Sequence, residues 1–407
     1  MFPRAPGGSL EDMVRIEETS RRSSATAGWL GVVTVALATF TVVTSEMLPV
    51  GLLTPIGAAL RVSEGTAGLT LTITGLVAAV SAPLLTAAFG RFDRRAVLAA
   101  LMTVLAAGNA LAAVAPNFAV MVVARVLVGL GMGGVWAIAA GISVRLVPAR
   151  SVGTATSLVF SGIAVASVLG VPAGTYLGEL AGWRAAFLVF AGLALALAVT
   201  LLLVLPPLPA EQPVGLGGVL SLLRNPVLRT GLIVMALIVT AHFAAYTYVR
   251  PALEEIAGVG PGLIGTLLLV YGVAGVLGNF AAGAGAARSP RATLVVISIG
   301  LAVTLPLLAI VGTSALTAGV VLVIWGVAYG GVSVGTQTWV LASVPDAREA
   351  ASSLFVGGFN AVIALGAFAG GRIVDAAGVS TVLYTGGALA VIAVAVLALG
   401  KAPSGSR

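Results

Sequence analysis

Twelve apolar stretches, each about as long as the ~30 Å hydrocarbon core of a bilayer requires of a helix, constrain this chain more than any other feature. They lie near residues 28–55, 66–89, 96–115, 118–142, 152–177 and 184–205, and then near 229–249, 261–287, 292–312, 315–342, 349–373 and 379–400. Only 9% of the residues are charged, against about 25% in soluble proteins. The sequence therefore predicts an all-α membrane protein with twelve transmembrane helices.

The composition also excludes several classes of function. The chain has no cysteine and a single histidine, His242, so it has neither a thiol nucleophile nor a cluster of metal ligands. The net charge is +7, but the basic residues are spread along the chain rather than gathered in a patch, which argues against nucleic-acid binding. We expect no enzymatic activity, no cofactor, no metal and no nucleic-acid partner.

A polar break divides the apolar stretches into two sets of six. Residues 206–218 read PPLPAEQPVGLGG, and VLSLLRNP after them predicts a short interfacial helix. We interpret residues 206–228 as a cytoplasmic linker between an N-terminal half, 28–205, and a C-terminal half, 229–400. Residues 1–27 are predicted to be a disordered cytoplasmic tail, and 401–407 form a short second tail. The first apolar run lacks a cleavage site, so we expect no cleavable signal peptide.

The basic residues predict the orientation, because loops rich in Lys and Arg stay in the cytoplasm. With both termini inside, four of the 21 basic residues fall on the outer side, namely Arg61, Arg184, Arg250 and Arg372. All others except Arg125, which lies within the fourth stretch, fall on the inner side. This asymmetry favours twelve spans, cytoplasmic termini and a place in a bacterial cytoplasmic membrane.

An internal repeat relates the two halves at an offset of 197 residues. The repeat matches Arg91 with Arg288, Arg94 with Arg291, and a run of glycines, which includes Gly65, Gly68 and Gly75 matched with Gly262, Gly265 and Gly272. Two parallel six-helix halves around a site at the midplane are the architecture of a large class of transporters.

Glu46 is one of two charged residues predicted to lie within the membrane. It follows most of an apolar span and precedes Pro49, which removes a backbone donor and loosens the helix. Burial of a lone carboxyl disfavours its charged form, which suits a group that takes up and releases a proton. The alternative is that Glu46 lies near a helix end and reaches water.

Arg125 is the second such charge, and it shares a helical face with Gly129, Met132 and Trp136. The repeat places Leu322 opposite Arg125 and Phe243 opposite Glu46, so the fold common to both halves requires neither charge. Two readings stay open for Arg125. It takes part in proton coupling, or it anchors the backbone carbonyls of a neighbouring span.

Polar and aromatic residues predict the substrate site. His242 and Tyr246 are four residues apart on one helical face, and histidine can titrate near neutral pH. Tyr248, closer to the outer surface, is predicted to belong to the interfacial aromatic belt. Trp136, Gln337 and Asn360 belong to the same candidate set, and Tyr271, Trp325 and Tyr329 rank after them as further aromatic groups.

These features together resemble the major facilitator superfamily, in particular its drug-proton antiporter branch with sugar-efflux and arabinose-exporter-like permeases. The resemblance covers residues 28–400. Its most specific marks are SEMLPVGLLTPI (45–56), TAHFAAYTYVRPALEEIAG (240–258) and PDAREAASSLFVGGFNAVIALGAFAGG (345–371). It implies that Arg125 and Glu46 couple transport to protons. It also implies that Gly170, Pro172 and Gly174, which look like the end of the antiporter motif, shape the contact between the halves.

The loop GRFDRRAVL (90–98) departs from the family pattern. It keeps the basic residues Arg91, Arg94 and Arg95 but has Gly90 where the usual acid stands, and Asp93 is displaced along the loop. The charge contacts that normally hold one conformation are therefore in question.

The leading hypothesis is a monomeric, proton-coupled antiporter that exports a small polar molecule, such as a sugar, by alternating access. Its partners would be the substrate, protons and the lipid bilayer. Export of neutral or cationic drugs and proton-driven uptake remain alternatives. A non-transporting receptor or membrane enzyme is a third class, which no sensor domain or catalytic cluster supports.

Overall fold

The computed structural model describes residues 10–88, 92–209 and 220–401, and all its regular elements over these ranges are helical. Twelve helical stretches are long and apolar enough to cross a membrane, which confirms the predicted number. The first half contains α1 (Leu10–Leu60), α2 (Glu64–Ala88), α3 (Arg94–Ala113), α4 (Phe118–Leu146), α5 (Val152–Ala181) and α6 (Trp183–Val204). The second contains α7 (Pro226–Tyr246), α8 (Val249–Glu255), α9 (Pro261–Arg288), α10 (Pro290–Val311), α11 (Ala315–Gly330), α12 (Val332–Ser343), α13 (Arg348–Ala377) and α14 (Val379–Leu399).

Two of the twelve spans are broken into paired helices. The seventh ends as α7 at Tyr246 and resumes as α8, where Pro251 has no N–H to bond the carbonyl four residues earlier. The tenth is divided into α11 and α12 at Gly330 and Gly331, residues with low helix propensity.

The N-terminal boundary differs from the sequence-based expectation. The disordered tail was predicted to extend to residue 27, but α1 already begins at Leu10 and runs unbroken into the first span. Residues 10–27 include three Glu and three Arg, which have high helix propensity, so the helix of the first span extends into them. In the linker, Leu220–Arg224 forms a short 3-10 helix within the segment where a short helix was expected.

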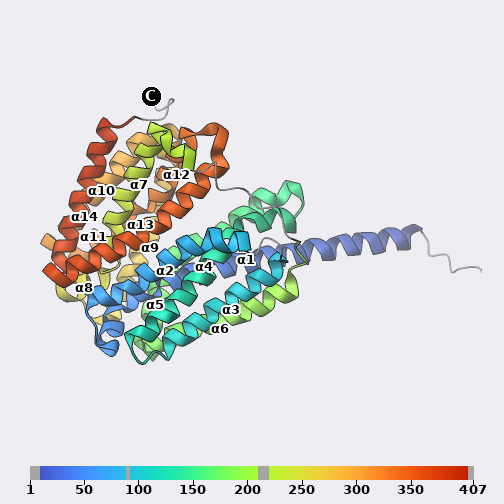
Figure 1. Ribbon diagram of the computed structural model, residues 1–407, viewed down its shortest axis with the longest axis horizontal. Coiled ribbons are helices and arrows are strands. Elements are labelled where there is room, and N and C mark those ends of the chain that lie inside the picture. The colour runs from blue at the N-terminus through green and yellow to red at the C-terminus, as the bar shows by residue number, and fades with distance from the viewer. Residues whose placement is uncertain (1–9, 89–91, 210–219, 402–407) are drawn as a thin grey trace, which may run out of the picture.

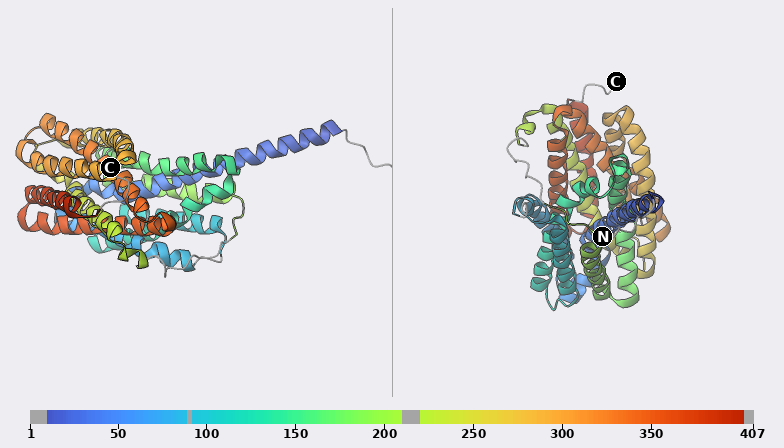
Figure 2. Two further views of the ribbon diagram at one scale, coloured as in Figure 1. Left: turned by 90° about the horizontal axis from the view of Figure 1, so that it is seen from above. Right: turned by 90° about the vertical axis from the view of Figure 1, so that its right-hand side faces the viewer.

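The two halves lie side by side and meet mainly at one end of their helices. In Figure 1 the first half runs along the lower right, the second rises at the upper left, and they join near α8 while their opposite ends diverge. We call the end at which the halves join the outer end, and the opposite end the inner end. The outer end carries the connections that the sequence predicts to lie outside, namely those after α1, α3, α5, α7, α10 and α13. Figure 2 shows the beginning of α1 projecting beyond the helices at the inner end.

The repeated glycines explain how the halves approach each other. Helix α2 packs along α13, and α5 packs along α9, in a pseudo-symmetric arrangement. A Cβ on Gly65 would collide with the backbone of Gly371, and a Cβ on Gly272 would collide with that of Val168. Residues without side chains allow these helices to touch, so the repeat marks the contact between the halves.

Hydrogen bonds also join the two halves at the outer end. Asp375 of α13 accepts from the Ser63 hydroxyl (2.9 Å) and from the backbone N–H of Gly65 (3.0 Å). It therefore caps the N-terminus of α2, where unpaired backbone donors favour a carboxylate. Tyr176 and Thr266 join α5 to α9 through their hydroxyls, 2.6 Å apart. The structure is thus closed at the outer end.

Candidate functional site

Glu46 lies inside the first span rather than at its end. Its side chain is 3% exposed, and Oε1 is completely buried with no hydrogen-bond partner among the described residues. The remaining exposure of the residue is small, so water reaches only the edge of this carboxyl. The alternative in which Glu46 extends freely into water at a helix end does not fit this position.

Arg125 is fully buried and bonds three backbone carbonyls rather than the Glu46 carboxylate. Nε donates to Thr70 of α2 at 3.0 Å, Nη1 to Ser45 of α1 at 3.0 Å, and Nη2 to the backbone oxygen of Glu46 at 3.1 Å. Ser45 is four residues before Pro49, whose ring nitrogen cannot donate the usual helical hydrogen bond. The guanidinium therefore replaces the donor that Pro49 lacks. This geometry corresponds to the interpretation in which Arg125 anchors the backbone carbonyls of neighbouring spans.

Arg250 makes the same kind of contact further along α1. Its Nη1 donates to the backbone oxygen of Gly51 at 2.6 Å, and Gly51 is four residues before Pro55. Its Nε pairs with Glu254 at 2.8 Å, and Glu254 accepts from the Thr54 hydroxyl at 2.6 Å. Arg250 was assigned to an outer loop, but it is 5% exposed and lies between the halves. For each proline within α1, an arginine thus donates a hydrogen bond to the carbonyl four residues earlier, which the proline cannot bond.

Asn109 of α3 is a buried polar residue that the sequence analysis missed. It is fully buried, and its Nδ2 donates to the Ser45 hydroxyl at 3.0 Å. Ser45 is therefore held through its backbone by Arg125 and through its side chain by Asn109. An isolated asparagine in an apolar span is costly to bury, which was the available signal.

His242 and Tyr246 lie in an aromatic group supplied by three helices of the second half, which we call the aromatic cluster. Its members are His242 and Tyr246 of α7, Tyr271 of α9, and Trp325 and Tyr329 of α11. The imidazole stacks on Tyr329 with ring centroids 3.3 Å apart and on Tyr246 at 4.9 Å. Trp325 donates from Nε1 to His242 Nδ1 at 3.1 Å.

The hydroxyls of the cluster are available to a ligand. None of Tyr246, Tyr271 and Tyr329 makes a hydroxyl hydrogen bond to a described residue, and none of these oxygens is among the completely buried unpartnered atoms. Tyr248 lies apart from them. It is fully buried and donates to the backbone of Ala367 at 2.9 Å, so its prediction as an interfacial belt residue was wrong.

The other predicted substrate residues are not joined to this cluster by any described contact. Trp136 packs on the core of the first half, and its Nε1 is buried without a partner. Asn360 donates to Val356 in its own helix at 2.9 Å, and its backbone borders Gly75 of α2. Gln337 of α12 is partly buried. The structure thus separates a charged site in the first half from an aromatic site in the second.

The loop residues organise the first half alone. Asp93 caps α3 by accepting from the Arg95 backbone at 2.8 Å, and it also accepts from the N–H of Leu208 at 3.1 Å. Arg95 donates to the backbone of Leu205 at 3.0 Å, while Nη1 of Arg94 is buried with no partner among the described residues. Arg91 lies outside the described residues. Asp93 therefore ties α3 to the chain after α6 and makes no described contact with the second half.

The residues of the antiporter motif divide between two contacts. Cβ atoms on Gly170 and Gly174 would meet Thr44 and Leu48 of α1, so these glycines face α1 and not the other half. Pro172 deprives Val168 of its helical donor, and the Val168 carbonyl lies against Gly272 of α9. Only the proline acts at the contact between the halves.

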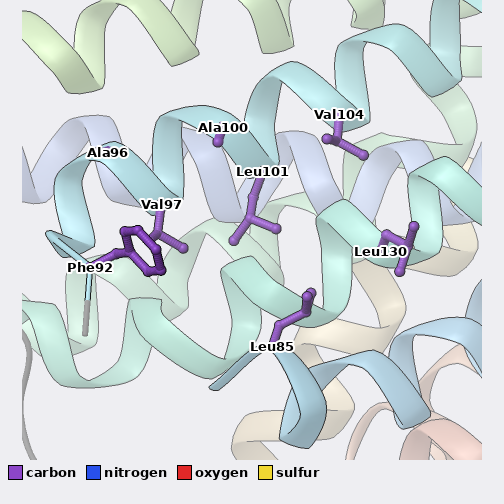
Figure 3. Close-up of a pocket in the computed structure, with 8 residues that line it drawn as sticks. All are labelled: Leu85, Phe92, Ala96, Val97, Ala100, Leu101, Val104 and Leu130. Atoms are coloured by element: carbon purple, nitrogen blue, oxygen red, sulfur yellow. The ribbon is translucent and has the colours of Figure 1, made fainter. Parts of the chain in front are cut away.

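A separate pocket opens near the inner ends of α2, α3 and α4. Its volume is about 360 Å³, and its walls are apolar (Figure 3), formed by Leu85, Phe92, Ala96, Val97, Ala100, Leu101, Val104 and Leu130. It contains neither the charged site nor the aromatic cluster. No group of three or more metal-ligating residues occurs among the described residues.

Known proteins resemble this chain along most of its length. The family model described as Major Facilitator Superfamily matches residues 35–355. The transcription regulatory protein OpdE of Pseudomonas aeruginosa is 34% identical, over 89% of this chain and 91% of that protein. The purine ribonucleoside efflux pump NepI of Salmonella paratyphi B is 33% identical, over 86% of this chain and 88% of the pump.

Solved structures share the fold. A bacterial homologue of the lysosomal transporter Spinster, solved in an inward-facing, unoccupied conformation, superimposes with a TM-score of 0.78 at 16% identity, covering 91% of this chain and 96% of that one. The nucleoside transporter NupG gives 0.77 at 14% identity, covering 91% and 100%. The names of these two relatives do not describe sugar exporters. The comparisons therefore support the superfamily and not specifically the sugar-efflux branch that the motifs resemble.

Proposed function

This chain belongs to the Major Facilitator Superfamily, and on that premise we propose that it exports a small, polar, uncharged organic molecule in exchange for protons. Purine ribonucleosides are the leading substrate class. The observation that carries the substrate class is the aromatic cluster, which offers stacked ring faces and unpaired hydroxyls on three helices. The name of the 33% identical efflux pump agrees with it.

A nucleoside suits the chemistry of the cluster. A purine base is planar and stacks on aromatic side chains, with a contribution of about 1 to 3 kcal/mol per base. A ribose and the ring nitrogens can accept and donate hydrogen bonds to tyrosine hydroxyls. No member of the cluster is a carboxylate that could balance the charge of a cationic substrate, which favours a neutral one.

Glu46 is proposed as the proton carrier. It is buried and unpaired, because Arg125 is already occupied by the carbonyls of Thr70, Ser45 and Glu46. Charged groups within a membrane usually serve function. A proton arriving from the outer side would neutralise Glu46, and its release at the inner side would follow the passage of substrate in the opposite direction.

Alternating access provides the pathway. The closed outer end and the diverging inner ends correspond to the state open to the inside, in which substrate is collected. We place the protein as a monomer in a bacterial inner membrane with both termini in the cytoplasm. The distribution of basic residues favours this orientation.

Counterflow in proteoliposomes tests this function. Vesicles are loaded with one unlabelled solute at a time and then given a trace of labelled inosine or guanosine. Vesicles loaded with a purine ribonucleoside should take up the label. Loading with arabinose or with a lipophilic cation should give no exchange. Exchange only with arabinose, or only with the cation, would overturn the proposed substrate class.

A further inference from the structure

We propose that Trp325 fixes His242 as a neutral imidazole with its proton on Nε2, and that this Nε2–H is the donor that recognises an acceptor atom on the ring of the substrate. Trp325 is thus a positioning residue, and His242 is a specificity-determining residue. The substrate part of this inference rests on the proposed function. The state of the imidazole does not.

The chemistry of the two rings decides the proton position. The indole Nε1 carries a hydrogen and can only donate, so the acceptor at 3.1 Å, His242 Nδ1, must hold a lone pair. A neutral imidazole with an unprotonated Nδ1 carries its hydrogen on Nε2. A second proton on Nδ1 would place two donors face to face and eliminate this hydrogen bond.

The Nε2 atom is left for a ligand. It makes no hydrogen bond to a described residue, yet it is not among the completely buried unpartnered atoms. His242 as a whole is only 1% exposed. The small accessible part of the ring therefore includes Nε2, and a buried donor without a partner is costly unless a ligand completes it.

The surroundings supply no opposing charge. The titratable groups in ring contact with His242 are the tyrosines at 246, 271 and 329, and its other neighbours are Phe243 and Trp325. No carboxylate, lysine or arginine is among these contacts. Proton coupling is thereby kept apart from substrate recognition, with Glu46 in the first half and a fixed neutral donor in the second.

The single histidine allows a direct test on the full-length protein. In a sample labelled with ¹⁵N-histidine, every imidazole signal comes from His242. We expect one protonated and one unprotonated nitrogen, with Nε2 protonated, unchanged between pH 8 and pH 6. Protonation of both nitrogens in this range, or a hydrogen on Nδ1, would overturn the inference even if nucleosides prove to be the substrates.

Two tryptophan variants separate the hydrogen bond from general packing. Trp325→Phe removes the donor, so the fixed Nε2–H pattern should give way to an exchange of tautomers. Trp339→Phe is the matched control, because Trp339 is equally buried but donates to the backbone of Val227 at 2.9 Å. An unchanged imidazole spectrum in Trp325→Phe, with both variants folded, would contradict the assigned role of Trp325.

Two histidine variants test recognition with inosine as the probe. Glutamine can place an amide N–H near the position of Nε2, whereas phenylalanine retains only the ring. We expect His242→Gln to bind inosine within about threefold of the wild type and His242→Phe to bind about tenfold more weakly, the loss of one hydrogen bond. If both variants weakened inosine binding equally, the proposed role of the Nε2–H as a hydrogen-bond donor to the substrate would be contradicted. Failure of the wild type to bind inosine would count against the proposed substrate class, while the spectra would still decide the tautomer.

Discussion

The Nη1 atom of Arg125 lies 3.0 Å from the backbone oxygen of Ser45, the carbonyl that Pro49 leaves without its helical partner. Arg250 stands in the same relation to Gly51 and Pro55. The first contact lies within the N-terminal half, and the second joins the two halves. With the proposed movement of the halves, we expect the first contact to persist and the second to break when the outer end opens.

A double-mutant cycle measures the first relation. Arg125→Met leaves the Ser45 carbonyl without a donor, and Pro49→Ala restores a helical N–H for it. The cost of Arg125→Met in the free energy of unfolding should therefore be about 1 to 2 kcal/mol smaller in the Pro49→Ala background. Unfolding in mixed micelles provides the measurement. The matched control is Pro55→Ala, whose effect should simply add to that of Arg125→Met; additivity in both cycles would contradict the link between Arg125 and Pro49.

The Asp375 cap should hold the outer end closed. Asp375→Ala removes the acceptor for Ser63 and for the N-terminus of α2, a change of about 0.5 to 2 kcal/mol. The chain has no cysteine, so a cysteine introduced as Ala67→Cys at this buried contact is the only site for maleimide. The rate of maleimide labelling then reports how often the outer end opens. We expect labelling to rise about threefold or more in Asp375→Ala and to stay near the wild-type rate in Asp375→Asn, which still accepts. Ala112→Cys, buried within the first half, should not respond. No difference between the alanine and asparagine variants would contradict the cap.

Gly272 should be essential for the approach of α9 to α5. A Cβ there would lie 2.8 Å from the Cα of Val168, and backbone cannot yield as a flexible side chain does. We expect Gly272→Ala to widen the outer end, measured as an increased distance between spin labels on Ala181→Cys and Ala376→Cys, both exposed outer positions. Gly192→Ala, where a Cβ meets nothing within 4 Å, should leave the distance unchanged. An unaltered distance in Gly272→Ala would show that the halves do not depend on this contact.

The sequence alone predicted the twelve spans, the two related halves and the position of Glu46 and Arg125 within the spans. Hydropathy and the repeat carry that information because the bilayer limits a chain to a few architectures. The sequence did not predict the helical start of α1 at Leu10, because a polar composition is typical of disordered tails as well as of solvated helices. One of the two interpretations of Arg125 named backbone carbonyls as its partners, and the structure shows such contacts. Which carbonyls Arg125 and Arg250 bond could not be predicted, since carbonyls leave no mark in a sequence, although the prolines four residues later were a clue. The aromatic cluster was seen only in part, because Tyr271, Trp325 and Tyr329 reach His242 from other helices.

The separation of proton coupling from substrate recognition is tested most directly by inosine flux in proteoliposomes under an imposed pH gradient. One proton per cycle sustains about tenfold accumulation per pH unit. In vesicles with an acidic lumen, the wild type and the control Glu255→Gln, at an exposed outer acid, should accumulate inosine. Glu46→Gln should exchange inosine in counterflow but gain nothing from the gradient. Gradient-driven accumulation by Glu46→Gln equal to that of the wild type would contradict the account.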